Sequence, residues 1–210
     1  MFGIDNYFAF VIAGILLNLT PGADTIYILT RSVAYGRRAG IYSVLGISTG
    51  CLVHTIFAAF GLSMILSTSA LIYNIIKFVG AGYLIYLGIK MYFDKSNLFE
   101  NQEIKPERNN LFQIYKQGLI TNVFNPKVAL FFLSFLPQFI SANDTYGSIP
   151  FLILGATFFT TGTLWCLFLA YSSSLMTHAL RRNKSISRIL QKVSGAIFVG
   201  LGLKLGFDRS

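Results

Sequence analysis

The sequence predicts an all-α integral membrane protein with six transmembrane helices, arranged as two inverted three-helix repeats with broken first helices. Composition is the first observation behind this prediction: of 210 residues, 54% are hydrophobic and 12% are charged. Soluble domains have roughly 25% charged residues, so this chain has too few to cover a water-exposed surface. The composition therefore excludes a disordered chain, a coiled coil and an ordinary soluble enzyme domain, and it indicates an integral membrane protein.

Six long apolar stretches are the second observation. A helix needs about 20 residues to cross a bilayer, and a spanning segment must satisfy its backbone polar groups internally. The stretches are continuously apolar and lack the two-residue alternation of a membrane barrel, so helices are predicted. They cover residues 7–29, 41–66, 70–93, 118–140, 149–176 and 189–207.

A repeated motif is the third observation. The sequence LGIKMYFD at 87–94 ends the third stretch, and LGLKLGFD at 201–208 ends the sixth. Each half has three spans, so the second half enters the membrane from the opposite side, and the repeat is predicted to be inverted, as in many secondary transporters. The predicted organisation is a first repeat at 1–93, a cytoplasmic linker at 94–117 and a second repeat at 118–210.

The net charge of +9 predicts an orientation in the membrane rather than a nucleic-acid partner. Lys and Arg concentrate in three polar gaps, after the first, third and fifth stretches, and do not follow one face as in a phosphate-binding groove. The first of these gaps contains Arg31, Arg37 and Arg38. Because basic loops stay in the cytoplasm, both termini are predicted outside, and the lipid bilayer is the expected partner.

The first stretch of each half is interrupted by a cluster of Asn and Pro. A proline inside a helix removes one backbone hydrogen bond, which here frees the carbonyl groups of Leu17 and Asn122. Paired interruptions at corresponding positions indicate a substrate site; the alternative is that each Pro only kinks its helix. The predicted substrate-binding residues are Asn18, Thr20, Pro21, Gly22 and Asp24 in the first half and Asn122, Asn125, Pro126 and Lys127 in the second.

Asp24 and Lys127 are expected to have a compensating partner or a function, because placing either charged side chain near the bilayer centre costs about 2.5–3.5 kcal/mol. One hypothesis is that they share a cavity, where Asp24 faces an ammonium group or exchanges protons and Lys127 attracts a carboxylate, as a small zwitterion requires. The alternative is a buried salt bridge that only fixes helix packing. His54 is a second candidate for proton coupling because the ordinary pKa of histidine is near neutrality; its alternative role is that of a hydrogen-bonded packing residue.

Other notable residues predict no catalytic or metal chemistry. Cys51 and Cys166 lie in apolar stretches without metal-ligand spacing and are interpreted as buried, inert thiols. The sequence has no catalytic constellation, so it predicts neither an enzyme nor a bound metal. Two pairs of glycines have the GxxxG spacing of closely packed helices, namely Gly46 with Gly50 and Gly202 with Gly206.

Two segments make the chain similar to the LysE/RhtB family of bacterial amino-acid exporters. The first, NLTPGAD at 18–24, resembles the N-terminal Pro-Gly motif of the family, although Ala23 stands where many members have a second Pro. The second runs from GLITNVFNPK at 118–127 to FLPQF at 135–139. With the six apolar stretches and GAGYL at 80–84, the resemblance covers essentially the whole chain.

This resemblance implies efflux of small amino acids or derivatives, such as homoserine, threonine, leucine or lysine, across the bacterial inner membrane. It further implies that the proton gradient drives transport, that an amino acid and protons are the partners, and that no cofactor is bound. It does not specify which amino acid is carried, or whether the chain acts as a monomer or a homodimer. The alternatives are an accessory or structural membrane subunit, or an exporter of another small metabolite.

Overall fold

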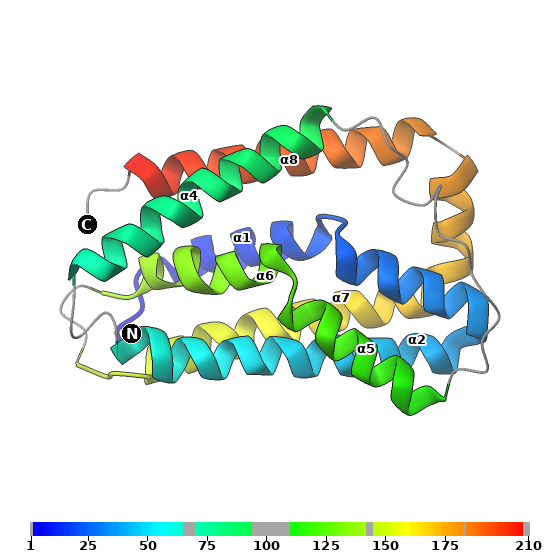
Figure 1. Ribbon diagram of the computed structural model, residues 1–210, viewed down its shortest axis with the longest axis horizontal. Helices are drawn as coiled ribbons and strands as arrows, with labels where there is room; N and C mark the ends of the chain where they lie inside the picture. Colours follow the sequence, from blue (N-terminus) through cyan, green and yellow to red (C-terminus); the bar gives the residue numbers. More distant parts are fainter. Residues whose placement is uncertain (1, 65–69, 94–109, 142–144, 183, 208–210) are drawn as a thin grey trace.

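The computed structural model describes residues 2–64, 70–93, 110–141, 145–182 and 184–207 (Figure 1). Within these ranges the chain is helical, and its strand-like feature is an isolated bridge between Ile4 and Ile140, so the all-α prediction is confirmed. Most of the predicted linker at 94–117 lies outside the described residues. The elements are α1 (Tyr7–Leu19), α2 (Ala23–Phe57), η1 (Ala58–Leu62), α4 (Ala70–Phe93), α5 (Leu111–Val123), α6 (Pro126–Leu130), η2 (Phe131–Phe135), η3 (Leu136–Phe139), α7 (Ile149–Arg182) and α8 (Lys184–Phe207).

The prediction of six transmembrane helices is met only in part. Among the described residues, two helices are long and apolar enough to cross a membrane, Ala23–Leu62 and Ile149–Ser173. The pair Leu111–Val123 and Pro126–Phe139, bent by 45°, makes a third if it is counted as one span. α1 has 13 residues, too few to cross a bilayer alone. The apolar helices agree with a membrane protein, while six spans in two inverted repeats are not established.

α2 contains a sharp break at Gly36, where φ is 80° and ψ is 179°. Glycine adopts a positive φ without steric cost, and a Cβ built there would meet nothing within 4 Å, so the backbone conformation rather than space requires glycine. Figure 1 shows that the helix runs in opposite directions before and after this break. The chain therefore reverses within the predicted gap between the first two stretches, but it does so at a sharp break and not in a polar loop: Arg31 lies inside the helix, and Arg37 follows the break directly.

Both predicted interruptions are present. α1 ends at Leu19 and α2 begins at Ala23, with Thr20 in an extended conformation between them. α5 ends at Val123, and α6 begins at Pro126 after Asn125 as its N-cap. Pro126 stands at the first position of its helix, where the missing N–H costs no hydrogen bond. In each case the proline explains where one helix stops and the next begins.

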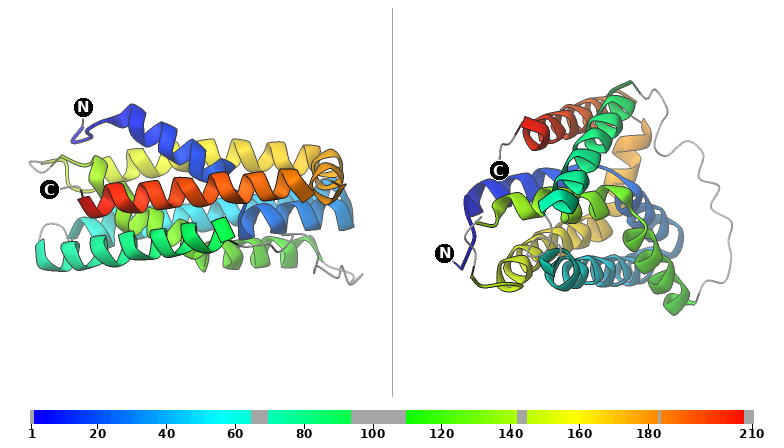
Figure 2. Two further views of the ribbon diagram at one scale, coloured as in Figure 1. Left: turned by 90° about the horizontal axis from the view of Figure 1, so that it is seen from above. Right: turned by 60° about the vertical axis from the view of Figure 1, so that its left-hand side comes forward.

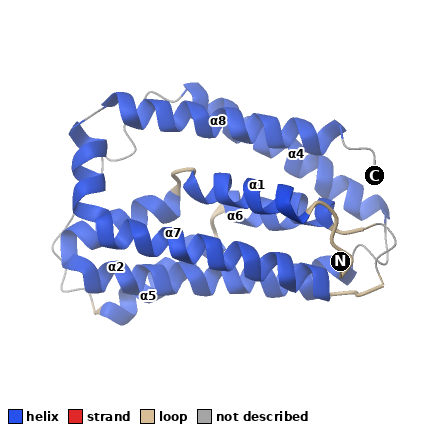
Figure 3. Cartoon of the chain, turned by 180° about the vertical axis from the view of Figure 1, so that it is seen from behind, coloured by secondary structure: helices blue, strands red, loops and turns tan. Residues whose placement is uncertain are grey.

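The helices form three layers, which Figures 1 and 3 show from opposite sides. α4 and α8 pack against each other in one outer layer, while α2, α5 and α7 pack together in the other. The short broken elements α1 and α6 lie between these layers. Figure 2 shows the start of α1 and the end of α8 at the same end of the molecule. The polar residues of both breaks are buried against other helices, namely Thr20, Asn122 and Asn125, as irregular backbone at membrane depth requires.

Glycines set the closest helix contacts. A Cβ added to Gly46 would collide with the carbonyl oxygen of Tyr115, and one added to Gly50 would lie 2.7 Å from the Asn122 side chain. In the other layer, a Cβ on Gly202 would lie 2.8 Å from the carbonyl oxygen of Ala81. The predicted close packing is thus confirmed at these three positions. It is wrong for Gly206, where an added Cβ would meet nothing within 4 Å.

A cluster of phenylalanine rings supports the second broken helix. Phe131 stacks on Phe158 of α7 with ring centroids 4.5 Å apart, and it also contacts Phe10 of α1 at 5.7 Å. All three side chains are buried. Such aromatic contacts give specific geometry as well as apolar burial, so this cluster fixes η2 against α1 and α7 just beyond the break.

Candidate substrate site at the two helix breaks

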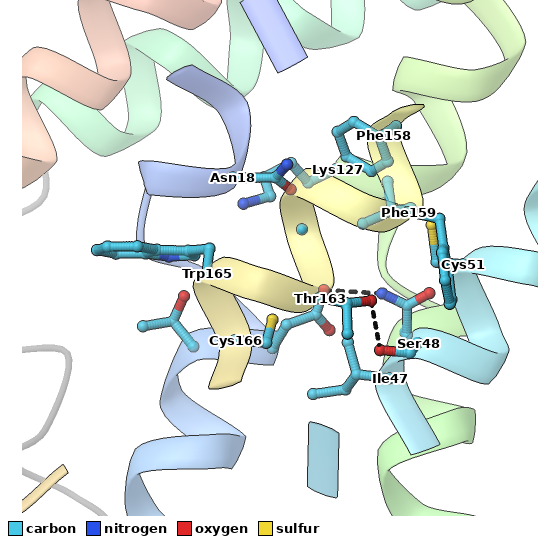
Figure 4. A pocket seen from close by; sticks show the side chains of 15 residues that line it. Asn18, Ile47, Ser48, Cys51, Lys127, Phe158, Phe159, Thr163, Trp165 and Cys166 are labelled. Atoms are coloured by element: carbon cyan, nitrogen blue, oxygen red, sulfur yellow. Dashed lines mark hydrogen bonds between the residues drawn. The ribbon is translucent and has the colours of Figure 1, made fainter. Parts of the chain in front are cut away.

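The two breaks meet at one cavity of about 40 Å³ (Figure 4). A water molecule needs roughly 10–15 Å³ of such space, so the cavity has room for a few waters. Its walls come from the end of α1, both arms of α2, the α5–α6 break and the middle of α7. The lining residues are Asn18, Asp24, Thr25, Ile47, Ser48, Cys51, Asn122, Lys127, Val128, Phe158, Phe159, Gly162, Thr163, Trp165 and Cys166.

At the first break, the Lys127 ammonium group bonds the end of α1. Its Nζ donates to the carbonyl oxygens of Leu17 at 3.1 Å and Thr20 at 2.9 Å. Pro21 has no N–H to offer Leu17, so this carbonyl is the one that the sequence predicted to be freed. It also accepts the backbone N–H of Thr20 at 3.2 Å. The C-terminal end of a helix carries a partial negative charge, which favours a cation there. Lys127 therefore joins the second half of the chain to the interrupted end of the first.

At the second break, the freed carbonyl of Asn122 is bonded by His54. The distance from His54 Nε2 to this oxygen is 3.2 Å, and the backbone N–H of Asn125 donates to the same oxygen at 3.0 Å. The side chain of Asn125 accepts a hydrogen bond from the backbone N–H of Lys127 at 3.1 Å and so caps α6. Both carbonyls predicted to be freed therefore have partners, but the partners differ in charge.

Asp24 faces the cavity with one oxygen bonded and one not. Its Oδ2 accepts from Nδ2 of Asn122 at 2.9 Å, whereas its Oδ1 and Oδ1 of Asn122 are buried without a hydrogen bond. Asp24 and Lys127 share the cavity, but no ion pair between them forms in the described part of the chain. The alternative of a buried salt bridge between them is therefore wrong, because the Lys127 ammonium is held by the carbonyls of α1 instead.

Four of the predicted site residues line the cavity: Asn18, Asp24, Asn122 and Lys127. The others form the two breaks and do not line it: Thr20, Pro21, Gly22, Asn125 and Pro126. His54 lies behind the cavity wall, where its ring stacks on Phe132 with centroids 5.6 Å apart. The sequence thus located the breaks, and folding decided which neighbouring side chains turn inward.

Sequence reasoning missed the contribution of α7. Ser48 of α2 and Thr163 of α7 share a hydrogen bond of 2.9 Å across the cavity, which Figure 4 shows as a dashed line. Nε1 of Trp165 is buried without a hydrogen bond at the same site. The signal was the polar run TTGT at 160–163 within an apolar stretch. Cys51 and Cys166, interpreted as inert, both line the cavity as free thiols.

Metal ligands do not gather here: among the described residues, no group of three His, Cys, Asp or Glu side chains is placed to hold a metal ion. The cavity instead offers a carboxylate, an ammonium group, amides and hydroxyls beside aromatic walls. Broken helices that meet at a polar cavity within apolar helices are the architecture of a membrane transporter.

The comparison with protein families agrees with this class. The family model described as LysE type translocator matches residues 15–209. The chain therefore belongs to the LysE type translocator family, and it is a transporter rather than an enzyme.

Individual relatives cover nearly the whole chain. The uncharacterized membrane protein YrhP of Bacillus subtilis (strain 168) is 34% identical, over 98% of this chain and 100% of the relative. The leucine efflux protein of Salmonella typhimurium (strain LT2) is 29% identical over 100% of this chain and 98% of the relative, and that of Enterobacter sp. (strain 638) is 28% identical over 97% and 96%. No solved structure matches the chain.

Proposed function

We propose that this protein exports small amino acids across the bacterial cytoplasmic membrane, driven by the proton gradient. The observation that carries the proposal is the cavity where both helix breaks meet, with Asp24 and Lys127 in its wall. A zwitterionic substrate needs an anion and a cation held apart, and this cavity contains both without an ion pair that would cancel them. The relatives named leucine efflux proteins support an amino acid as substrate and export as direction.

The substrate would bind through both of its charges. Its ammonium group would face the unbonded Oδ1 of Asp24, which is buried and therefore favours a hydrogen-bond donor. Its carboxylate would take the ammonium of Lys127 and the unbonded N–H of Trp165, which line the same cavity. Asn18, Asn122 and Asn125 would supply amides from the two breaks, and Thr20, Pro21, Gly22 and Pro126 would set the backbone geometry.

The cavity in this conformation is too small for an amino acid. At about 40 Å³ it has room for a few waters, which is less than the space that an amino acid with an alkyl side chain fills. Transport therefore requires the walls to separate, and this conformation would be a closed intermediate between one that opens inward and one that opens outward.

Alternating access of two inverted halves would supply that movement. Contacts related by the predicted repeat support it: an added Cβ on Gly50 would lie 2.7 Å from the Asn122 side chain, and one on Gly162 would lie 3.1 Å from that of Asn18. In each pair, a glycine of the second helix of one half faces the asparagine at the break of the other half. Such matched contacts are expected of an inverted repeat. Both termini and the gaps without Lys or Arg would then face outward.

Proton coupling would use Asp24, His54 or both. Asn122 links them, because its side chain donates to Asp24 and its carbonyl contacts His54. A carboxylate that binds a proton in one conformation and a substrate ammonium in the other would exchange the two across the membrane.

The test is efflux from proteoliposomes. Release of a labelled amino-acid panel would be measured with and without an imposed pH gradient, for wild type, Asp24→Asn and the control Asp5→Asn, whose carboxyl is exposed away from the cavity. We expect gradient-driven release of one or a few amino acids, reduced at least about tenfold by Asp24→Asn, which corresponds to roughly 1.4 kcal/mol of transition-state free energy. Release unaffected by Asp24→Asn would refute the site, and no release of any panel member would refute the amino-acid substrate.

An accessory subunit is the alternative, because the bonds of Lys127 to the α1 backbone are also what a packing element would make. Replacing both charges with apolar residues, Asp24→Leu with Lys127→Met, separates the two functions. A packing role predicts that the double variant retains its partner and its cellular function, whereas a transporter loses flux.

A further inference from the structure

The end of α1 binds a cation that belongs to the chain itself. Nζ of Lys127 makes two hydrogen bonds, to the carbonyl oxygens of Leu17 and Thr20. Both residues are buried, with 1% and 2% of their surface exposed, so no bulk water replaces the lysine there. An ammonium group has three N–H donors, and the third is free to face the cavity that Lys127 lines.

The position of the Lys127 ammonium group is explained by the partial charge at the end of α1 and not by that at the start of α6, the helix that contains Lys127. Lys127 is the second residue of α6, after Pro126, where the partial positive charge of a helix N-terminus disfavours a cation. At the C-terminal end of α1 the partial charge is negative, and two carbonyl oxygens converge on Nζ. The favourable electrostatic interaction therefore lies with the α1 carbonyls.

The surroundings of this end also suit a small cation. Gly22 has no side chain, and a Cβ there would lie 3.4 Å from Nζ, so the backbone leaves the space to the ammonium. Oδ1 of Asp24 is buried without a hydrogen bond in the same cavity. Carbonyl oxygens of unwound backbone and of half-helix C-terminal ends are the ligands that bind sodium in broken-helix transporters.

We propose that the C-terminal end of α1 is a monovalent-cation site, formed by the carbonyl oxygens of Leu17 and Thr20, which the Lys127 ammonium occupies in place of a free ion. The chain would thereby supply its own cation. This site goes beyond the export proposed above, because it concerns cation binding at the helix break. The proposal does not depend on which substrate the cavity binds.

Removal of the lysine side chain should expose the site to a free cation. In the Lys127→Ala variant, added sodium should raise the thermal midpoint Tm of the purified protein. n-Propylammonium should do the same, because it has the same heavy atoms as the part of the lysine side chain that the substitution removes. The rise should be about 2–4 °C at five times the Kd of the ion. Choline chloride at equal concentration controls for ionic strength, and 1-propanol controls for n-propylammonium without its charge.

Two further variants serve as controls. Lys127→Met fills the space with an uncharged chain of similar length, so its Tm should not respond to either cation. Lys116→Ala removes an exposed lysine whose ammonium lies over the Phe112 ring, and it should behave as wild type. Lys127→Ser is the second test variant if Lys127→Ala does not fold, because its short side chain also leaves room for an ion.

Each outcome of these Tm measurements either supports or overturns the cation site. A rise in Tm confined to Lys127→Ala or Lys127→Ser, caused by sodium or n-propylammonium and not by choline or 1-propanol, supports the site. No cation-specific rise in those variants, or an equal rise in wild type and Lys127→Met, overturns it. Because Tm is measured without transport, the conclusion about the cation site remains valid even if the export proposal fails.

Discussion

At both breaks the carbonyl freed by proline accepts a backbone N–H from three residues further along the chain, from Thr20 at the first break and from Asn125 at the second. The second partner of that carbonyl differs: it is the Lys127 ammonium group at the first break and the His54 imidazole at the second. The second break also has a side-chain N-cap in Asn125, and the first has none, because Gly22 stands in that position. The second break is thus satisfied largely by local contacts. The first has the local contacts of Thr20 but, in place of a side-chain cap, two long-range hydrogen bonds from Lys127, so it is the one more easily disturbed.

Because of this difference, the two breaks should respond differently when the helices move. A backbone segment held by its own cap keeps its geometry when other helices move. A segment that relies partly on a distant side chain loses those hydrogen bonds as soon as that side chain leaves. Lys127 stands on the self-capped break and reaches the uncapped one, so a movement between the halves would act first on the end of α1.

The largest effect is expected from Lys127→Met. It removes the donor of the buried Thr20 carbonyl, at a cost of about 1–3 kcal/mol, and the charged donor of the Leu17 carbonyl, which keeps the bond from the Thr20 backbone N–H. We expect the free energy of unfolding in detergent to fall by about 2–4 kcal/mol. Denaturant titration followed by the fluorescence of Trp165, the one tryptophan of the chain, would measure it.

Lys116→Met is the matched control for this comparison, since Lys116 is exposed and the change should stay within about 0.5 kcal/mol. Equal losses in the two variants would show that the first break does not depend on Lys127.

Gly50→Ala should have the next largest effect, and Gly162→Ala should have a smaller one. The added Cβ at position 50 would lie 2.7 Å from both Cβ and Oδ1 of Asn122, which is buried and bonded to Asp24. Overpacking of this kind costs about 1–3 kcal/mol, and the displacement of Asn122 should also slow efflux. At position 162 the nearest atom is Oδ1 of the partly exposed Asn18, at 3.1 Å.

Paired measurements of unfolding and efflux would check this order. If Gly162→Ala is as damaging as Gly50→Ala, then Asn18 is held as firmly as Asn122, and the proposed difference between the breaks is incorrect.

The smallest effect is expected from Asn125→Ala, which removes the cap of α6. Loss of an N-cap costs about 0.5–2 kcal/mol, and the backbone bond from Asn125 to the Asn122 carbonyl remains. Asn110→Ala is the control, because Asn110 caps α5 in the same way but is exposed. Thermal unfolding of both variants should show the larger loss at position 125. A loss at Asn125 as great as that of Lys127→Met would mean that the second break also depends on one side chain.

Much of this arrangement could be predicted from local sequence. The apolar composition indicated helices, and α4 begins and ends where the third stretch was expected, at Ala70 and Phe93. The positions of both breaks followed from Pro21 and Pro126, because the missing N–H and the ring of proline act within four residues of the chain. The same local argument identified the carbonyls of Leu17 and Asn122 as the ones in need of a partner.

Other features could not be predicted, because they depend on contacts between distant segments. The partners of the freed carbonyls were not apparent, since the direction of the Lys127 side chain depends on the angle of the break. The contribution of Thr163 and Trp165 follows from the packing of α7 against α2. The reversal between the first two stretches was predicted within residues 30–40, but its exact position at Gly36 was not, because helical residues flank the break on both sides.

The sequence by itself determined that this protein is helical and apolar, where its helices break and which ionisable residues lie among apolar ones, since composition and proline act locally. The tertiary structure alone decided that both breaks meet at one cavity, and that Asp24 and Lys127 share it without forming an ion pair. The physical reason is electrostatic: the carbonyl oxygens at the end of α1 attract the ammonium of Lys127, and only folding brings that end within its reach.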